Sequence, residues 1–189
     1  MATGITNVHA KWVSGNLVYQ DNSGNTIFTI SPTGIARTSQ EHSINTGAKV
    51  GATSTVGWAL GGGAVDTGML ATLAASATAD TLIIPIPDLK VGDTITSFTI
   101  NGQIESGGNT ATLDADLRAM TPVATGSTDA SIGAITQISK TADYLVNDSK
   151  TGLSETVTAG KGYYILITGT TAASTDIEIT SISVTVTTS

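Results

Sequence analysis

The sequence predicts an all-β protein: an antiparallel β-sandwich or jelly roll with an N-terminal β-hairpin arm. Threonine is the commonest of the 189 residues, and with Val and Ile it supplies β-branched side chains that suit a pleated sheet. Several stretches alternate apolar and polar residues, which is the period of a half-buried strand. The best helical candidate, residues 67–79, has no charged residue to form a solvent-facing side. Short strands with Gly-rich turns therefore favour a sandwich.

The first element is the hairpin arm, placed in residues 1–33. Residues 16–20 (NLVYQ) and 26–31 (TIFTIS) read as its strands. Residues 21–25 (DNSGN) between them are all turn formers, and Gly24 can adopt a positive φ. This pattern predicts a hairpin.

The middle of the chain reads as a connection. Residues 34–54 are polar, dotted with glycine and show no period, so we expect an extended linker there. A structureless stretch of that length is unusual inside a compact domain. We therefore expect the β-sandwich domain to span residues 55–189.

The body of the chain reads as strand after strand. Residues 81–86 and 163–168 are apolar at consecutive positions, as in strands buried on both faces. Residues 95–104 and 111–119 alternate, and 111–119 is the cleanest half-buried pattern of the chain. Turns are expected at residues 88–93 and 106–109.

The last strand carries a change of phase. Ile177 and Ile179 share one face, whereas Ile182, Val184 and Val186 fall on the other. One extra residue between the two groups would return both to the same face. The sequence therefore predicts a β-bulge between Ile179 and Ile182.

Composition excludes several classes of protein. Eight Lys and Arg against fifteen Asp and Glu give a net charge of −7, so no groove for nucleic acid is expected. The absence of Cys excludes disulfides, zinc thiolates and cysteine nucleophiles. The densest apolar run, residues 82–87, is too short to cross a bilayer, and the first residues do not resemble a secretory signal.

Catalytic, cofactor and metal sites are not expected. His9 and His42 have no matching acid or nucleophile nearby in sequence, and surface positions are favoured for both. Asp114 and Asp116 share the outer face of a strand with Arg118, so partners for Arg118 or simple solubilising groups are favoured over a metal site. No paired carboxylates typical of glycoside hydrolysis are visible, because the glutamates are scattered: Glu41, Glu105, Glu155 and Glu178.

Apolar side chains crowd the hairpin arm. An isolated hairpin is marginal in water and cannot bury them by itself. A sister subunit or another protein is the favoured cover, and the sandwich body is the alternative. The expected assembly and docking residues are Trp12, Leu17, Val18, Tyr19, Ile27, Phe28 and Ile30.

The chain resembles the structural proteins of tailed-phage virions. Residues 11–21 (KWVSGNLVYQD) with 24–28 (GNTIF) are similar to a short hairpin theme that precedes a sandwich in such proteins. Residues 82–85, 91–93 and 113–118 are similar in style to β-sandwich modules of phage heads and fibres.

The resemblance implies a non-enzymatic head-decoration or head-fibre protein. Its location would be the capsid surface of the virion, after synthesis in the host cytoplasm. It implies a homotrimer whose N-terminal arm docks on the major capsid protein or another virion protein. The alternative is a tail-fibre or adhesin module that binds a host surface glycan. The loops expected at residues 121–130 and 144–158 could form its site, with Tyr144 as their one aromatic residue.

Overall fold

The fold was analysed in a computed structural model. It describes residues 9–14, 16–30, 40–42, 49–51, 57–60 and 71–187, of which 27–30, 40–42 and 49–50 are described by their backbone alone. Every regular element in these ranges is a β-strand, and every strand pair is antiparallel. The all-β class is confirmed. No helix of these ranges is long and apolar enough to span a membrane.

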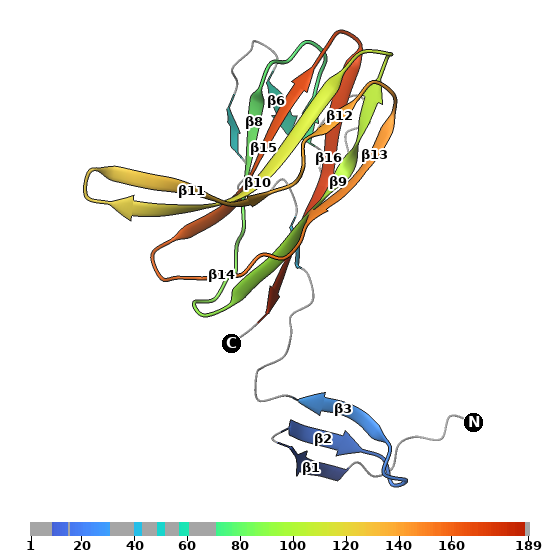
Figure 1. Cartoon of the computed structure of the whole chain (residues 1–189), viewed down its shortest axis with the longest axis vertical. Coiled ribbons are helices and arrows are strands. Elements are labelled where there is room, and N and C mark those ends of the chain that lie inside the picture. The colour runs from blue at the N-terminus through green and yellow to red at the C-terminus, as the bar shows by residue number, and fades with distance from the viewer. Residues whose placement is uncertain are drawn as a thin grey trace.

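The strands form three sheets (Figure 1). A three-stranded sheet has the order β1-β2-β3. A six-stranded sheet has the order β11-β10-β15-β8-β5, with β12 beside β10. A seven-stranded sheet has the order β13-β9-β16-β7-β6, with β14 beside β9 and β4 beside β16. The strands are β1 (His9–Val13), β2 (Asn16–Gln20), β3 (Thr26–Ile30), β4 (Gln40–His42), β5 (Lys49–Gly51), β6 (Trp58–Leu60), β7 (Ala71–Leu73), β8 (Asp80–Pro85), β9 (Thr94–Ser106), β10 (Ala111–Val123), β11 (Gly126–Ala134), β12 (Ile138–Lys140), β13 (Tyr144–Lys150), β14 (Glu155–Thr156), β15 (Gly162–Thr171) and β16 (Thr175–Thr187).

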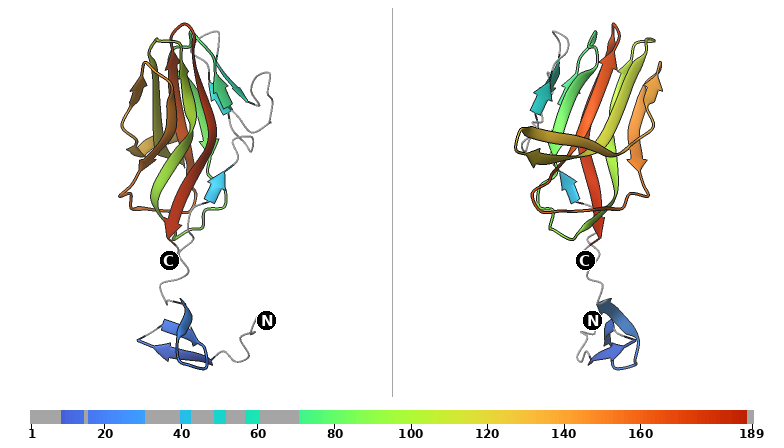
Figure 2. Two further views of the ribbon diagram at one scale, coloured as in Figure 1. Left: turned by 90° about the vertical axis from the view of Figure 1, so that its right-hand side faces the viewer. Right: turned by 60° about the vertical axis from the view of Figure 1, so that its left-hand side comes forward.

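The two larger sheets stack as the layers of a sandwich (Figure 2). Leu82, Leu113 and Ile165 of one sheet and Phe98 and Ile100 of the other belong to one buried cluster. Burial alternates along β8 and β15, so these strands are fully buried on one face and half-buried on the other. These strands were predicted to be apolar on both faces, as in a sandwich core, and they do contribute to the core, with their second face only half-buried.

The β-bulge predicted in the last strand is confirmed. The pairing of β16 with β9 skips one residue between Ile179 and Ser181, which leaves Thr180 out of register. The partner of Ile179 is Gly102, and a Cβ at Gly102 would collide with the main-chain carbonyl of Glu178. The bulge therefore requires glycine at position 102.

The segment expected as a linker, residues 34–54, contributes two strands to the sandwich. β4 pairs with β16, and β5 pairs with β8 at the edge of the six-stranded sheet. The described part of this segment is therefore hydrogen-bonded to the body, and the start of the sandwich does not coincide with residue 55. Strands of three residues are too short to show a period in sequence.

The arm has one more strand than the predicted hairpin. β2 and β3 form that hairpin, and the Asp21 carboxylate accepts hydrogen bonds from the Ser23 and Asn25 amides at 2.9 and 2.8 Å. β1 then pairs with β2, so the arm is a three-stranded antiparallel sheet. None of its strands joins either larger sheet.

A two-stranded ribbon projects from the sandwich (Figure 1). β10 is paired with β15 only as far as Met120, while its last residues remain paired with β11. We call residues 121–130 the ribbon. They were expected as a loop, but they are largely exposed strand residues around a turn at 124–125.

Candidate functional site

One hollow of the sandwich lies between the base of the ribbon and the segment that leads into β14. We call it the cleft, and its volume is about 400 Å³. Volumes of this size are typical of small-molecule sites. Its lining residues are Ala119, Ala130, Ser131, Ile132, Gly152, Leu153, Ser154, Glu155 and Lys161.

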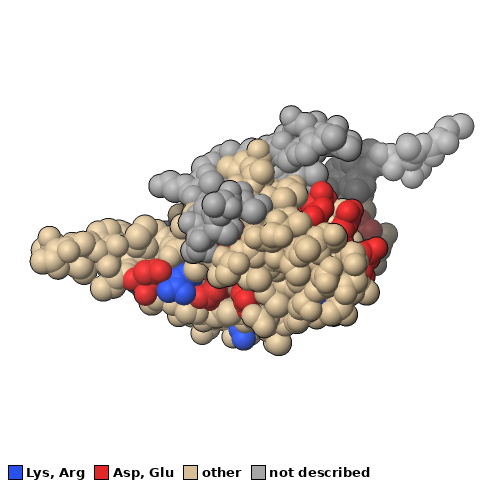
Figure 3. Space-filling model, turned by 90° about the horizontal axis from the view of Figure 1, so that it is seen from above, with Lys and Arg blue, Asp and Glu red and all other residues tan. Residues whose placement is uncertain are grey.

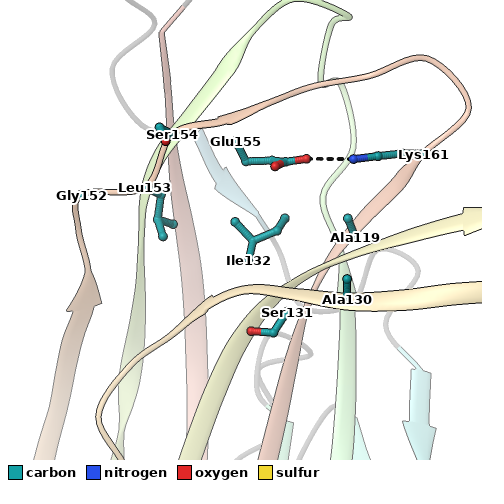
Figure 4. A pocket seen from close by; sticks show the side chains of 9 residues that line it. All are labelled: Ala119, Ala130, Ser131, Ile132, Gly152, Leu153, Ser154, Glu155 and Lys161. Atoms are coloured by element: carbon teal, nitrogen blue, oxygen red, sulfur yellow. Dashed lines mark hydrogen bonds and ion pairs between the residues drawn. The ribbon is translucent and has the colours of Figure 1, made fainter.

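The cleft has an apolar wall and a charged wall (Figure 4). Ile132 and Leu153 form much of the apolar wall. Across from them the Lys161 ammonium lies 3.3 Å from a carboxylate oxygen of Glu155. The Ser131 hydroxyl donates to Asp116 at 2.6 Å and is therefore committed to the outer face of the sheet. The cleft thus presents hydrocarbon on one side and a paired donor and acceptor on the other.

A buried tyrosine fixes the charged wall. The Tyr163 hydroxyl lies 3.1 Å from the Oε1 atom of Glu155, and it accepts a 3.1 Å hydrogen bond from the Thr158 amide. Tyr163 itself is only 6% exposed. Because this hydroxyl on β15 contacts both the Glu155 carboxylate of β14 and the Thr158 amide that follows β14, it holds Glu155 on the side of Lys161.

The apolar wall is fixed by backbone contacts. The Leu153 amide donates to the Thr96 carbonyl at 3.0 Å, which ties the segment before β14 to β9. A Cβ at Gly133 would lie 2.7 Å from Leu153 Cδ2, so β11 approaches this side chain closely only because position 133 is glycine. Gly152 has a φ of +71°, a conformation that favours glycine in the turn after β13.

A second hollow shares Lys161 with the cleft and has a volume of about 360 Å³. Lys161 lines both spaces. Val91, which is 66% exposed, contributes apolar surface to the second hollow. The remaining lining comes from the ends of β8 and β15 and the turns beside them: Pro85, Ile86, Asp88, Leu89, Val157, Thr158, Ala159, Gly160, Gly162 and Tyr163.

The outer face of the same sheet carries an ion-pair network that secures the ribbon. Arg118 donates to Asp116 at 2.7 Å and to Asp129 of the ribbon at 3.0 Å, so the predicted partner of Arg118 is confirmed. Charged side chains of both signs lie together near the ribbon base in Figure 3. The hydrogen bond from Arg118 lowers the pKa of Asp129, and burial raises the pKa of neighbouring Tyr164. These groups satisfy one another, which indicates a structural role.

The arm spreads the expected docking residues over its strands. Trp12 is 72% exposed, and it lies opposite Leu17, which is half-buried like Tyr19. Val18 is buried at 7% and does not offer a docking surface. Ile27, Phe28 and Ile30 lie on β3, but their side chains are outside the described residues. Docking by this set remains a prediction.

Tyr144, the aromatic residue expected at a glycan site, lies elsewhere. The Lys140 ammonium sits 4.0 Å from the centre of its ring. The parts of segments 121–130 and 144–158 that do meet at the cleft are Ala130 and residues 152–155. Lys161 was not expected to take part. The sequence clue was the turn TAGKG at 158–162, which folds Lys161 back onto Glu155.

The described residues form no cluster of metal ligands, and the two histidines lie outside the cleft or outside the described side chains. Within the described ranges no three His, Asp or Glu residues gather as metal ligands. His9 is exposed, as expected, with its Nε2 atom 3.2 Å from the Asn22 side-chain oxygen. The side chain of His42 lies outside the described residues.

Comparison with known proteins gives structural similarities alone. No family model matches the sequence, and no curated protein matches it. Among solved structures, it is similar to the CBM22-1 xylan-binding domain of Paenibacillus barcinonensis Xyn10C, with a TM-score of 0.44 and 11% identity over 79% of this chain and 94% of that one. It is also similar to a carbohydrate-binding module of the β-sandwich superfamily, with a TM-score of 0.37 and 15% identity over 94% of this chain and 74% of that one.

A phage protein is also among the similar structures. The enzymatically active domain of tailspike protein 4 from bacteriophage CBA120 matches with a TM-score of 0.35 and 13% identity. The match covers 72% of this chain and 18% of that one. All these identities are below the level at which a ligand or activity could be carried across. The likeness concerns the β-sandwich alone.

Proposed function

We propose that the chain is a non-enzymatic glycan-binding module and that the cleft is its binding site. The observation that carries this proposal is that an apolar wall and a charged wall line the same cleft, which has a volume of about 400 Å³. A sugar ring has the same division, because its C–H groups form an apolar face and its hydroxyls form a polar edge. Ile132 and Leu153 would contact the face, and Glu155 and Lys161 would bind the edge.

The charged wall suits two hydroxyls on adjacent ring carbons. Their oxygens are about as far apart as the 3.3 Å between Lys161 Nζ and Glu155 Oε1. One hydroxyl would donate to the carboxylate while its neighbour accepts from the ammonium. Because Lys161 has three N–H donors and Glu155 takes one, the pair can engage such a ligand without separating.

Affinity electrophoresis tests this proposal. The protein would run in native gels containing xylan, mixed-linkage β-glucan or dextran, and we expect retardation by at least one of them. Glu155→Gln and Lys161→Met remove the ionic partners of the hydroxyls and should abolish the retardation. Lys140→Met is the matched control, because it removes another half-buried lysine charge outside the cleft.

Two results would contradict the proposal. One is unretarded migration in all three gels at millimolar sugar concentration. The other is retardation that persists unchanged in both cleft variants, which would locate binding elsewhere on the chain.

The exposed Trp12 favours a second function, attachment to a larger assembly. A tryptophan that is 72% exposed on a sheet of only three short strands is typical of a contact surface. We propose, in line with the phage resemblance, that the arm joins subunits or docks on a virion protein at the capsid surface. In that arrangement the sandwich would carry the cleft outward.

Light scattering tests the role of the arm. The full chain should have the mass of a trimer, and a chain starting near Gly34, which lacks the arm and keeps β4 and β5, should have the mass of a monomer. Trp12→Ala in the full chain should weaken the trimer, whereas Lys11→Ala on the same strand should not. A full chain that is monomeric at high concentration would contradict self-assembly through the arm. If the full chain and the truncated chain are both trimers, the sandwich and not the arm forms the trimer.

A further inference from the structure

Two hollows meet at a single side chain in the sandwich. The cleft, of about 400 Å³, and the second hollow, of about 360 Å³, are both lined by Lys161. We infer that the ligand is an oligomeric sugar chain that passes over Lys161 and occupies both hollows. This inference rests on the proposed function and adds the length of the ligand and its path.

The backbone around Lys161 leaves room for such a path. Gly160 and Gly162 flank it, and a Cβ at either position would meet no other atom within 4 Å. Lys161 therefore stands between two positions that carry no side chain. Its own side chain is 31% exposed and is held on the cleft side by Glu155.

The second hollow repeats the amphipathic character of the cleft. Val91 is 66% exposed, and Leu89 packs partly against the core, so both offer hydrocarbon to a ligand. Asp88 and the Thr158 side chain supply polar groups to the same space. A polymer of sugar rings repeats its apolar faces and hydroxyl edges, so successive rings can use successive hollows. A single ring would fill one hollow and leave the exposed Val91 surface without a ligand.

Isothermal titration calorimetry with ligands of two lengths tests the inference. The probes are xylobiose and xylohexaose, cellobiose and cellohexaose, and isomaltose and isomaltohexaose. In the series that binds, we expect the hexasaccharide to bind at least tenfold more tightly than the disaccharide. Equal affinity for the two lengths would overturn the inference and leave the glycan-binding proposal standing.

Variants of the second hollow test whether it provides the additional affinity for the hexasaccharide. Val91→Asn removes exposed hydrocarbon there and should reduce the affinity for the hexasaccharide about fivefold, with the disaccharide unchanged. Leu145→Asn is the matched control, since Leu145 is 78% exposed and lines neither hollow. Gly162→Leu places a side chain into the second hollow and should have the larger effect. Thermal denaturation would verify that each variant is folded.

The results separate the two proposals. Unchanged hexasaccharide affinity in both Val91→Asn and Gly162→Leu would overturn the path over Lys161. Absence of binding by all six oligosaccharides would overturn glycan binding itself, and the inference with it. If Gly162→Leu reduces the affinity for the disaccharide and the hexasaccharide equally, both ligands bind in the second hollow. This result would also contradict a path over Lys161 through both hollows.

Discussion

Gly102→Ala should strongly destabilise the sandwich, because a Cβ at this position has no room beside β16. The added Cβ would overlap the Glu178 carbonyl oxygen and would lie 3.0 Å from the Glu178 carbonyl carbon and 3.1 Å from the Ile179 Cα. All three atoms belong to the backbone of β16. No change of side-chain conformation can therefore relieve the overlap, and β9 and β16 must move apart at the bulge.

The expected cost is at least about 3 kcal/mol. Forced overpacking in a core costs about 1–3 kcal/mol when side chains can adjust, and here they cannot. Separation of the strands would also weaken ladder hydrogen bonds beside the bulge, each worth about 1 kcal/mol. With a urea dependence of about 2 kcal/mol per molar, the midpoint of unfolding should fall by about 1.5 M.

Urea unfolding followed by tryptophan fluorescence is a suitable assay. Trp58 is 4% exposed in the sandwich and donates to the Asp80 carbonyl at 2.9 Å, so its emission should change on unfolding. Trp12→Phe would remove the other tryptophan. Gly162→Ala is the matched control, because its Cβ has open space and should change stability by less than about 0.5 kcal/mol. Equal midpoints for the two alanine variants would refute the account of the bulge.

Three further predictions concern the ribbon, the cleft and the arm. The pKa of Asp129 is lowered by Arg118, so their ion pair stabilises the ribbon at pH values above the ordinary carboxyl pKa. This stabilisation is lost as the pH falls through the lowered pKa. Arg118→Met should return the pKa of Asp129, measured by carboxyl NMR, toward its ordinary range. Tyr163→Phe leaves the Thr158 amide without its 3.1 Å partner and should cost about 1–3 kcal/mol in urea unfolding, with no cost contradicting its anchoring role. Trp12→Ala should leave the urea midpoint of the sandwich unchanged, since the strand that carries it pairs only within the arm.

Strand positions in the body could be predicted because each long strand carries its own period. The bulge in β16 followed from the change of phase between Ile179 and Ile182, and it lies between Ile179 and Ser181. β4 and β5 could not be found in this way. Each has three residues, and each is defined by a partner strand, β16 or β8, that lies far along the chain.

The cleft was only partly predictable. The sequence identified the two segments, 121–130 and 144–158, that contribute Ala130 and residues 152–155 to the cleft. It did not identify the pairing of Glu155 with Lys161, because that contact depends on the turn between β14 and β15 and on the Tyr163 hydroxyl beneath it. Tyr144, the one aromatic residue of these two segments, does not line the cleft and lies under Lys140.

The ribbon also makes the fold tolerant of added sequence. Its turn at residues 124–125 is exposed and lies beyond the last residue of β10 that pairs with β15. A peptide inserted there would extend a two-stranded finger and would leave the register of the sheet behind it untouched. The Arg118 ion pairs at the base would keep that finger anchored. The same scaffold could therefore present new loops, and acquire new specificities, without any change in its core.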